Sequence, residues 1–427
     1  MRILYSILLY LAVPVVLLRL LWRGFRAPGY WQRWYQRFGF RLGQPLKQCI
    51  WVHAVSVGEV RAATPLIKQI RSRYPGCFLL VSTTTATGSA QVLQDDELGA
   101  RHVYTPYDLP GSVRRFLDHF QPCVAIIIEA ELWPNLFRAC HQRHVPVMVV
   151  NARLSAKSAQ RYQRVAGLTA ETLRVVSLIA AQTEIEADRF RQLGAGREAV
   201  HVTGNIKFDL TLPASLQEQA ASLRRDWGQA RPVWIAASTH EGEDEIMLQA
   251  QALLRENFPH ALLVLVPRHP ERFSRVATLS RARGYPTVLR SQHSPCPADA
   301  AVFIGDSMGE LCLFYAAADI AFVGGSLVPT GGHNILEPAL LGKPVLFGTH
   351  MFNFAEASSL LLTADAAIQV SNAAMLAQTL GELFADAQRR HAAGDRARQV
   401  VEQNRGALDK TMRLLAAGID SHCRTGE

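Results

Sequence analysis

The chain has 427 residues, of which 49% are hydrophobic and 19% charged, and its formal net charge is +9. This length is sufficient for two domains with cores of their own. The first 58 residues contain eight Arg and Lys residues and no Asp or Glu, so the rest of the chain is nearly neutral. This distribution excludes the spread basic surface of a nucleic-acid-binding domain and indicates a basic segment next to an apolar one.

The apolar segment is residues 3–18, and with residues 20–22 it approaches the roughly 20 residues that span a bilayer. A secretory signal peptide is one alternative, but basic residues from Arg19 onward follow the segment and no A-x-A cleavage site does. A buried core helix is the other alternative, although such a helix is rarely apolar on every face and then followed by so many basic residues. We therefore predict a single-pass membrane anchor over residues 1–25, with the bulk of the protein on the cytoplasmic side, where the positive residues lie.

Residues 26–48 form a neck that is rich in aromatic and basic side chains. Within it, Trp31 and Trp34 alternate with Arg33 and Arg37. This mixture is typical of segments that lie at a membrane interface and contact anionic head groups. The alternative is a solvated, loosely ordered neck.

The seven cysteines are scattered along the chain and form no C-x-x-C motif. Several lie within apolar segments, so the sequence predicts reduced, mostly buried thiols in a cytosolic compartment. Cys140 and His144 have a spacing seen in metal sites, but they lie on a predicted helix with no acidic residue near them. A pair of side chains on a helix surface is the commoner arrangement.

From residue 49 onward, apolar β-rich segments alternate with segments of helical periodicity, which predicts parallel sheets covered by helices on both faces. The pattern weakens over residues 207–231 and then restarts. This linker separates a predicted N-terminal Rossmann-like domain (49–206) from a C-terminal one (232–427). The last helical stretch, 372–419, is a candidate to pack back across the joint. Two such domains that face each other place their strand carboxyl ends on a shared cleft, where ligands bind.

Three segments at strand ends of the N-terminal domain carry unusual polar residues. Glu59, in S-V-G-E-V-R, is the first acidic residue of the chain and stands at a predicted helix start. Glu129 and Glu131 directly follow a buried strand, and Lys207 stands where the linker begins. Each acid alone is explained as a helix-start carboxylate that the helix dipole keeps ionised. The delivery of Glu59, Glu129 and Lys207 to one edge instead indicates a catalytic site.

The richest segment of the C-terminal domain runs from Val323 to Leu346. Paired glycines follow a strand and precede a predicted helix start near His333. This arrangement suits a phosphate, because the backbone can approach it closely and the helix offers N–H groups. Glu337 lies in that helix, in a position to accept hydrogen bonds from ribose hydroxyls. The alternative is a flexible loop in which Glu337 is a capping residue.

Two further strand ends of the C-terminal domain point to the same cleft. Arg268 and His269 follow one strand, and an Arg there can clamp a phosphate, although a surface salt bridge is nearly as good an explanation. Asp306 follows another strand, and residues 308–310 begin a helix in a position to hold a base edge or a sugar. Three such strand ends in one domain favour a nucleotide-donor site.

Taken together, these segments resemble the Kdo transferases, which move 3-deoxy-D-manno-oct-2-ulosonic acid (Kdo) from CMP-Kdo to lipid A precursor in Gram-negative bacteria. The resemblance covers essentially the whole chain and rests on H-A-V-S-V-G-E, E-A-E-L-W-P-N, T-G-N-I-K-F-D, P-R-H-P-E-R-F, G-D-S-M-G-E-L and G-G-H-N-I-L-E-P-A. It implies a GT-B fold of two Rossmann-like α/β domains that face a cleft. It also implies an inverting transferase that uses no metal or other cofactor.

The resemblance assigns roles to individual residues. It implies that Glu59 is the general base and that Glu129 and Lys207 stabilise the transition state. The residues that it assigns to CMP binding are Pro267, Arg268, Met308, Gly309, Glu310, Asn334, Ile335, Leu336 and Glu337. The implied partners are CMP-Kdo, a lipid A precursor (lipid IVA) and the lipids of the inner membrane, with the catalytic domains on its cytoplasmic face.

Two other classes of protein fit parts of the pattern. A UDP-sugar lipid glycosyltransferase or a sugar-nucleotide epimerase would share the fold, but the epimerases are usually soluble, so the predicted anchor argues against them. A non-catalytic, membrane-tethered sugar-nucleotide-binding protein would not require the acids at the strand ends of the N-terminal domain.

Overall fold

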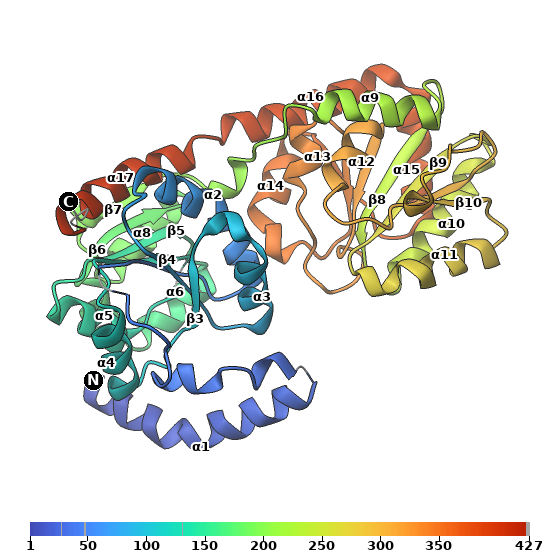
Figure 1. Cartoon of the computed structure of the whole chain (residues 1–427). Helices are drawn as coiled ribbons and strands as arrows, with labels where there is room; N and C mark the ends of the chain where they lie inside the picture. The colour runs from blue at the N-terminus through green and yellow to red at the C-terminus, as the bar shows by residue number, and fades with distance from the viewer. Residues whose placement is uncertain (27, 47, 130, 424–427) are drawn as a thin grey trace. The chain divides into compact units, whose positions relative to one another are not determined.

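The computed structural model describes residues 1–423 except residues 27, 47 and 130, and its first sheet has seven parallel strands in the order β3-β2-β1-β4-β5-β6-β7. The strands are β1 (Ile50–His53), β2 (Leu79–Thr83), β3 (Arg101–Tyr104), β4 (Val124–Ile128), β5 (Val147–Ala152), β6 (Val176–Ala181) and β7 (Val200–Val202). β1, β2, β4 and β5 are buried along their whole length, because helices cover both faces of the sheet (Figure 1).

The helices of the chain up to residue 209 begin where the sequence offers a cap or a proline. Ser56, Thr85 and Thr183 are N-caps, and the hydroxyl of each accepts a hydrogen bond from the N–H three residues further on. Pro110 and Pro134 each open a helix. These helices are α1 (Arg2–Arg26), α2 (Val57–Arg73), α3 (Ala86–Gln94), α4 (Pro110–Phe120), α5 (Pro134–Gln142), α6 (Ala156–Gln163), α7 (Ala166–Leu173) and α8 (Glu184–Gln192), with 3₁₀ turns η1 (Pro28–Tyr30), η2 (Trp34–Phe38), η3 (Asp96–Leu98), η4 (Arg197–Ala199) and η5 (Ile206–Phe208).

The second sheet is also parallel and has seven strands, in the order β10-β11-β9-β8-β12-β13-β14. Its strands are β8 (Val233–Thr239), β9 (Leu262–Pro267), β10 (Thr287–Leu289), β11 (Val302–Ile304), β12 (Ile320–Val323), β13 (Val345–Phe347) and β14 (Ala367–Gln369). The helices of this part are α9 (Leu216–Trp227), α10 (Glu243–Arg255), α11 (Phe273–Ala282), α12 (Leu311–Ala317), α13 (Leu336–Leu340), α14 (Ala355–Thr363), α15 (Ala373–Ala385) and α16 (Ala387–Gln403), with turns η6 (Pro270–Arg272), η7 (Arg290–Gln292) and η8 (Phe352–Phe354). The two doubly wound sheets confirm the predicted α/β architecture.

The chain divides into an N-terminal unit, made of Met1–Asp209 and the segment from Arg405 onward, and a C-terminal unit, Leu210–Asn404. The last helix, α17 (Ala407–His422), therefore returns to the N-terminal unit, as we expected for part of the stretch 372–419. The expected domain 232–427 differs from the structure in its end, because the C-terminal unit ends at Asn404. The apolar side chains of α17 join the core that β1 and β4 share with α2, and this burial explains the return. The side chains that do so are Leu408, Met412, Leu415 and Ile419.

The expected linker, residues 207–231, also differs from the structure. About half of it forms α9, whose Trp227 is only 2% exposed and packs on Phe303 and Phe314 of the C-terminal unit. Arg224 forms an ion pair with Asp319 at 3.0 Å. The sequence of α9 is mostly polar and only a few of its side chains are buried, so the sequence did not predict these contacts.

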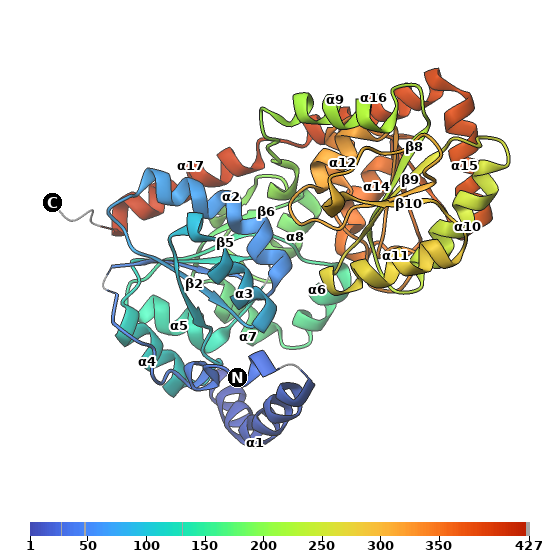
Figure 2. The ribbon, with the colours of Figure 1, turned by 45° about the vertical axis from the view of Figure 1, so that its right-hand side comes forward.

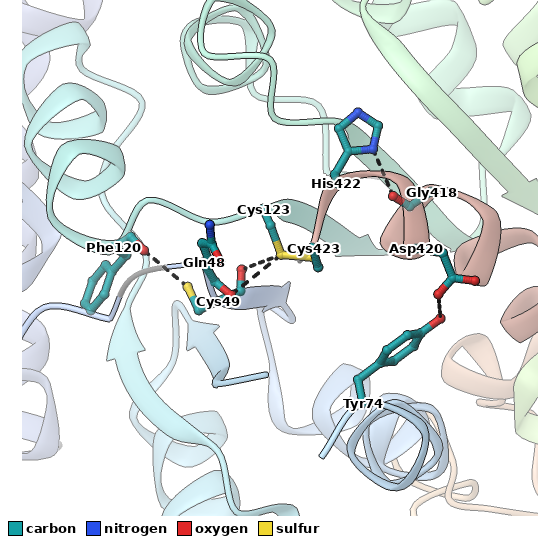
Figure 3. Close-up of a disulfide and its surroundings, with 9 residues drawn as sticks. All are labelled: Gln48, Cys49, Tyr74, Phe120, Cys123, Gly418, Asp420, His422 and Cys423. Carbon is teal, nitrogen blue, oxygen red and sulfur yellow. Dashed lines mark hydrogen bonds between the residues drawn. A yellow bond between two sulfur atoms is a disulfide. The ribbon is translucent and has the colours of Figure 1, made fainter. Parts of the chain in front are cut away.

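A disulfide joins Cys123, directly before β4, to Cys423, directly after α17 (Figure 3). Their Cα atoms are 5.2 Å apart although 300 positions separate them in the sequence. This bond corrects the prediction that all the cysteines are reduced, and no local pattern predicts it, because it depends on the return of α17. The same end of α17 is also held by Asp420, which accepts a hydrogen bond from the Tyr74 hydroxyl at 2.7 Å (Figure 3).

Helix α1 is long and apolar enough to cross a membrane, with a mean hydropathy of 2.2 over Arg2–Phe25. Only 6% of this stretch is buried within the protein. The start of α1 nevertheless lies near α4 (Figure 2), and α1 also contacts α5, so this end of the helix rests on the rest of the N-terminal unit. Tyr5 donates to Asp108 at 3.0 Å and Ser6 to Asn135 at 3.0 Å, so the first turns of the helix are held by hydrogen bonds.

Candidate active site

The topology of the first sheet brings two acids to one place. β1 and β4 are neighbours, and the chain builds outward from them in opposite directions, so the gap between their carboxyl ends is the topological switch point at which such sheets bind ligands. Glu59 lies in the first turn of α2, which follows β1, and Glu129 directly follows β4. The switch point of the N-terminal unit is therefore lined by two of the predicted catalytic residues.

Glu59 is held by the start of its own helix. Its carboxylate accepts hydrogen bonds from the Val55 N–H at 2.7 Å and from the Ser56 hydroxyl at 3.0 Å. The Glu59 N–H in turn donates to the Ser56 hydroxyl at 3.4 Å, so Ser56 and Glu59 form a variant of the capping box in which the glutamate accepts from the N–H one residue before the N-cap. This geometry fixes the side chain at the strand end.

We expected the helix N-terminus to keep Glu59 ionised, and the structure corrects this. Burial raises the pKa of the Glu59 carboxyl from 4.5 to about 7, although the Val55 N–H and the Ser56 hydroxyl both lower it. The negative charges of Glu129 and Glu131 raise it further. A carboxylate with a pKa near 7 can both accept and release a proton near neutral pH, as a general base must.

Glu129 and Lys207 form an ion pair in which the Lys207 Nζ lies 3.2 Å from a Glu129 carboxylate oxygen, and the side chains are 25% and 23% exposed. Glu129 adopts a left-handed backbone conformation, with φ of +62°, which is uncommon for a residue other than glycine and is concentrated at functional sites. Lys207 lies in η5, where the Asn205 side chain accepts its N–H at 3.1 Å. The structure thus brings Glu59, Glu129 and Lys207 together.

Glu131 is a half-buried acid beside this group. Burial raises its pKa, and the charge of Glu129 raises it as well. Because Glu131 also raises the pKa of Glu59, three carboxyl groups lie close to one another in the region that holds the predicted lysine, Lys207.

The switch point of the second sheet lies between β8 and β12. The predicted CMP-binding segments follow β9, β11 and β12, which lie with β8 in four neighbouring strands, β11-β9-β8-β12. Pro267 ends β9, and the Arg268 N–H donates to the Thr239 carbonyl at the end of β8 at 3.0 Å. The structure therefore places the predicted phosphate-binding Arg beside the switch point.

A residue that the sequence analysis missed, Glu243, organises this region. Its carboxylate is fully buried and accepts hydrogen bonds from four backbone N–H groups. The donors lie at 2.7–3.0 Å and are His240, Gly325, Ser326 and Leu327. The backbone at the first glycine pair, which we expected to approach a phosphate, is thus already occupied by a carboxylate. The sequence signal for Glu243 is its place three residues after His240, at the start of α10.

The second glycine pair is required by its surroundings. Gly331 and Gly332 have φ of +101° and +75°, and an added Cβ would lie 2.4 Å from Phe352 and 2.3 Å from Met351, respectively. The backbone of this loop is therefore restricted to glycine at both positions, and it leads directly into the segment 333–337.

The predicted helix near His333 begins later, at Leu336, and is the short α13. Asn334 bridges its start: its amide donates to the Glu337 carboxylate at 3.0 Å and its carbonyl oxygen accepts from the Leu336 N–H at 3.1 Å. Ile335 and Leu336 are fully buried, so their side chains belong to the core and only their backbone is available to a ligand.

The segment 308–310 has a mixed character. Met308 is 65% exposed, and Gly309 has a left-handed φ of +84°. Glu310 pairs with both ends of the Arg290 guanidinium, at 2.7 and 3.0 Å, and also accepts from Ser307. The Arg290 pair lowers the pKa of Glu310, so its carboxylate is ionised and committed to Arg290, a partner that the sequence did not indicate.

Among the residues that the structure describes, no group of three or more His, Cys, Asp or Glu side chains is arranged to hold a metal ion. Cys140 is fully buried, in the core that lines the α4 and α5 face of the first sheet.

Comparison with known proteins identifies relatives along nearly the whole chain. Residues 32–210 match the family model described as "3-Deoxy-D-manno-octulosonic-acid transferase (kdotransferase)". The 3-deoxy-D-manno-octulosonic acid transferase of Haemophilus influenzae is 42% identical, over 97% of this chain and 98% of that protein. The enzyme of the same name from Bordetella pertussis is 37% identical, over 96% of this chain and 98% of that protein.

Among solved structures, the UDP-GlcNAc 2-epimerase of Neisseria meningitidis bound to UDP-GlcNAc has a TM-score of 0.58. The two sequences are 14% identical, and the match extends over 87% of this chain and 100% of the epimerase chain. At this identity the similarity concerns the fold alone, and it agrees with the predicted two-domain GT-B architecture.

Proposed function

The chain belongs to the Kdo transferase family, and from this premise we propose that it moves Kdo from CMP-Kdo to a hydroxyl of a lipid A precursor, lipid IVA, at the cytoplasmic face of the inner membrane. The observation that carries the proposal is the group at the first switch point: Glu59, with a pKa of about 7, next to the Glu129–Lys207 pair. This group offers a base and a charged pair at one strand edge, as attack by a sugar hydroxyl needs.

Glu59 is the general base of this mechanism. As the acceptor oxygen attacks the anomeric carbon of Kdo, its proton passes to the Glu59 carboxylate. The capping box holds that carboxylate in one position, so no side-chain freedom is lost at the moment of transfer. Its pKa near 7 lets the proton leave again for solvent before the next cycle.

Glu129 and Lys207 act on charge during transfer. Kdo is an acidic sugar, and the departing nucleotide carries away the electrons of the bond that breaks, so the reacting centre changes its charge. Both side chains of this ion pair are partly exposed, so they can turn towards the reacting groups as the charge changes. Lys207 then faces the anionic groups, and Glu129 faces the positively charged anomeric centre.

The donor nucleotide binds at the strand ends of the C-terminal unit. In this proposal Arg268 contacts the phosphate, and the Asn334–Glu337 pair accepts and donates hydrogen bonds at the ribose. Pro267, Ile335 and Leu336 contribute backbone, and the loop 308–310 covers the nucleotide. No metal or other cofactor takes part in the proposed reaction.

α1 attaches the enzyme to the membrane that holds its lipid acceptor, as a single-pass anchor with the catalytic domains cytoplasmic. A second arrangement is favoured by one observation, the hydrogen bonds from Tyr5 to Asp108 and from Ser6 to Asn135. A helix that lies in the plane of the membrane keeps these bonds, whereas a spanning helix must break them. Labelling of a cysteine introduced at the first residues, from either side of sealed vesicles, separates the two.

The function is tested by incubating the purified protein with CMP-Kdo and tetraacylated lipid A precursor. Mass spectrometry should find Kdo on the lipid, with release of one CMP for each Kdo transferred. Release of UDP from a UDP-sugar, or epimerisation of the sugar nucleotide, would support the enzymatic rivals. Binding of CMP-Kdo without any turnover would support a sugar-nucleotide-binding protein.

A further inference from the structure

Two histidines meet across the switch point of the second sheet. His240 follows β8, and His333 follows the glycine loop after β12. Their Nε2 atoms are 2.8 Å apart, their ring centroids are 5.0 Å apart and their planes are 7° from parallel, so the two rings meet edge to edge through these nitrogens. At this distance one Nε2 carries a proton and donates, and the other accepts. A ligand at this switch point therefore meets a hydrogen-bonded imidazole pair.

The pair is held in place by the surrounding backbone. The Glu243 carboxylate accepts the N–H groups of His240 and Gly325, and thereby joins the ends of β8 and β12. The His333 ring lies about 3 Å from where a Cβ on Gly325 would be, so only glycine fits at that position. The two rings are positioned by the fold itself before a ligand arrives.

The surroundings of His240 are mostly cationic. Burial lowers its pKa, and the positive charges near it lower the pKa further, whereas the Glu243 carboxylate acts in the opposite direction. In the ligand-free protein His240 is thus neutral at neutral pH. The groups that face it are His333 from the loop after β12, Glu243 from α10, Arg268 and His269 from the end of β9, and Arg272 from η6.

We propose that the His240–His333 pair binds the phosphate of the donor nucleotide and takes up one proton from solvent when the phosphate is bound. This inference rests on the proposed function and gives a role to two side chains, His240 and His333, that were not among the residues assigned to CMP binding, although His333 lies within the predicted phosphate-binding segment. The pair lies between Arg268 and the segment 334–337, which the proposal assigns to the phosphate and the ribose. The proton adds to Nδ1 of the donating ring, so the hydrogen bond between the rings is kept and becomes charge-assisted.

The proton has a defined use in the reaction. The phosphate of CMP-Kdo is a diester with one negative charge, and CMP leaves with two, because the electrons of the bond to the anomeric carbon stay on the phosphate oxygen. The proton of the acceptor hydroxyl goes to Glu59, so it does not neutralise this new charge. An imidazolium beside the phosphate compensates the additional charge as it develops. The proton returns to solvent when CMP is released.

The test is calorimetric titration of the full-length protein with CMP at pH 7.5, in two buffers of different ionisation enthalpy. The difference between the observed enthalpies gives the number of protons taken up. We expect the wild-type protein to take up close to one proton, and H240Q and H333Q to take up none and to bind CMP about tenfold more weakly. The matched control is H391Q, an exposed His on α16 of the same unit, which should behave as wild type.

The outcomes separate this inference from the function on which it rests. CMP binding without proton uptake by the wild-type protein, or unchanged uptake in both H240Q and H333Q, overturns the inference and leaves the donor site in place. Absence of CMP binding to the wild-type protein overturns the donor assignment itself, and the inference with it. Thermal melting of each variant shows whether it is folded, and the two variants test the same pair independently.

Discussion

Replacement of Glu59 by Gln separates its chemical role from its structural role. In the capping box the Glu59 carboxylate accepts from the Val55 N–H and the Ser56 hydroxyl. A Gln side chain at this position keeps an oxygen that accepts from the Val55 N–H and offers an amide N–H to the Ser56 hydroxyl. The hydrogen bonds at the start of α2 are therefore retained. What Glu59→Gln loses is the ability to take a proton. We therefore expect a folded protein with normal CMP affinity and a rate of Kdo transfer lower by about 10²–10⁴-fold.

The same substitution should also change how the stability of the protein depends on pH. Because the pKa of Glu59 is raised from 4.5 to about 7, the folded protein holds a proton that the unfolded chain releases between those pH values. Stability from the protonated group is thus present at low pH and is lost as the pH rises from about 4.5 to 7. At 1.36 kcal/mol per pKa unit, the loss reaches at most about 3 kcal/mol. Glu59→Gln cannot ionise, so its Tm should exceed that of the wild type at pH 8, and the gap should narrow towards pH 5.

Two measurements check this reasoning. Transfer from CMP-Kdo is followed by CMP release and by mass spectrometry of the lipid, and Tm is recorded at pH 5, 6, 7 and 8. In the wild-type protein, kcat/KM should fall about tenfold per pH unit below pH 7, because only ionised Glu59 can act. A variant that keeps more than about a tenth of the wild-type turnover would exclude Glu59 as the main base. A wild-type protein that gains stability between pH 5 and 8 relative to the variant would refute the raised pKa.

Three further predictions concern the donor site, the anchor and the disulfide. Arg268→Ala and Glu337→Ala should each weaken CMP binding about ten- to a hundredfold, because a hydrogen bond to a charged group contributes roughly 1.5–3 kcal/mol; unchanged affinity of both in calorimetry would place the nucleotide elsewhere. Deletion of residues 1–25 should release the protein from membranes with CMP binding intact, and a truncated protein still sedimenting with vesicles in high salt would reveal a second membrane-binding surface. Cys423→Ser removes a cross-link that spans 300 positions, so it should lower the free energy of unfolding by roughly 2–5 kcal/mol without reductant and by little with reductant. Equal free energies of unfolding for the variant and the wild type without reductant would mean that the bond is absent in solution.

The alternating strands and helices were predictable because they depend on local sequence patterns. The alternation of apolar strands and helical segments depends on neighbouring residues, and the strand ends that carry Glu59, Glu129 and Arg268 follow from it. The acids at the first switch point were recognisable as unusual because a carboxylate after a buried strand needs a reason to be there. The order of the strands then places those acids next to each other.

The features that were missed depend on contacts between distant residues. α9 carries few buried side chains, so its sequence does not show which unit it joins. α17 has a clear apolar face, but its sequence alone does not show which of the two units that face packs on. The Cys123–Cys423 bond follows only from the return of α17. The pKa of Glu59 was predicted in the wrong direction, because the helix dipole is a local feature, whereas burial and the charges of Glu129 and Glu131 are tertiary ones.

The two sheets use one local design for different purposes. In each, the first strand leads through a glycine to a glutamate at the start of the next helix: Gly58-Glu59 after β1 and Gly242-Glu243 after β8. The Glu243 carboxylate is fully buried and accepts four backbone N–H groups, which satisfy its oxygens and leave it to hold the ends of β8 and β12 together. The Glu59 carboxylate accepts one backbone N–H and one hydroxyl and lies near two other acids. Glu59 has fewer hydrogen-bond donors and lies near negative charges, so its carboxylate readily accepts a proton. The number of N–H groups around each glutamate therefore separates the structural role of Glu243 from the role of Glu59 as a base.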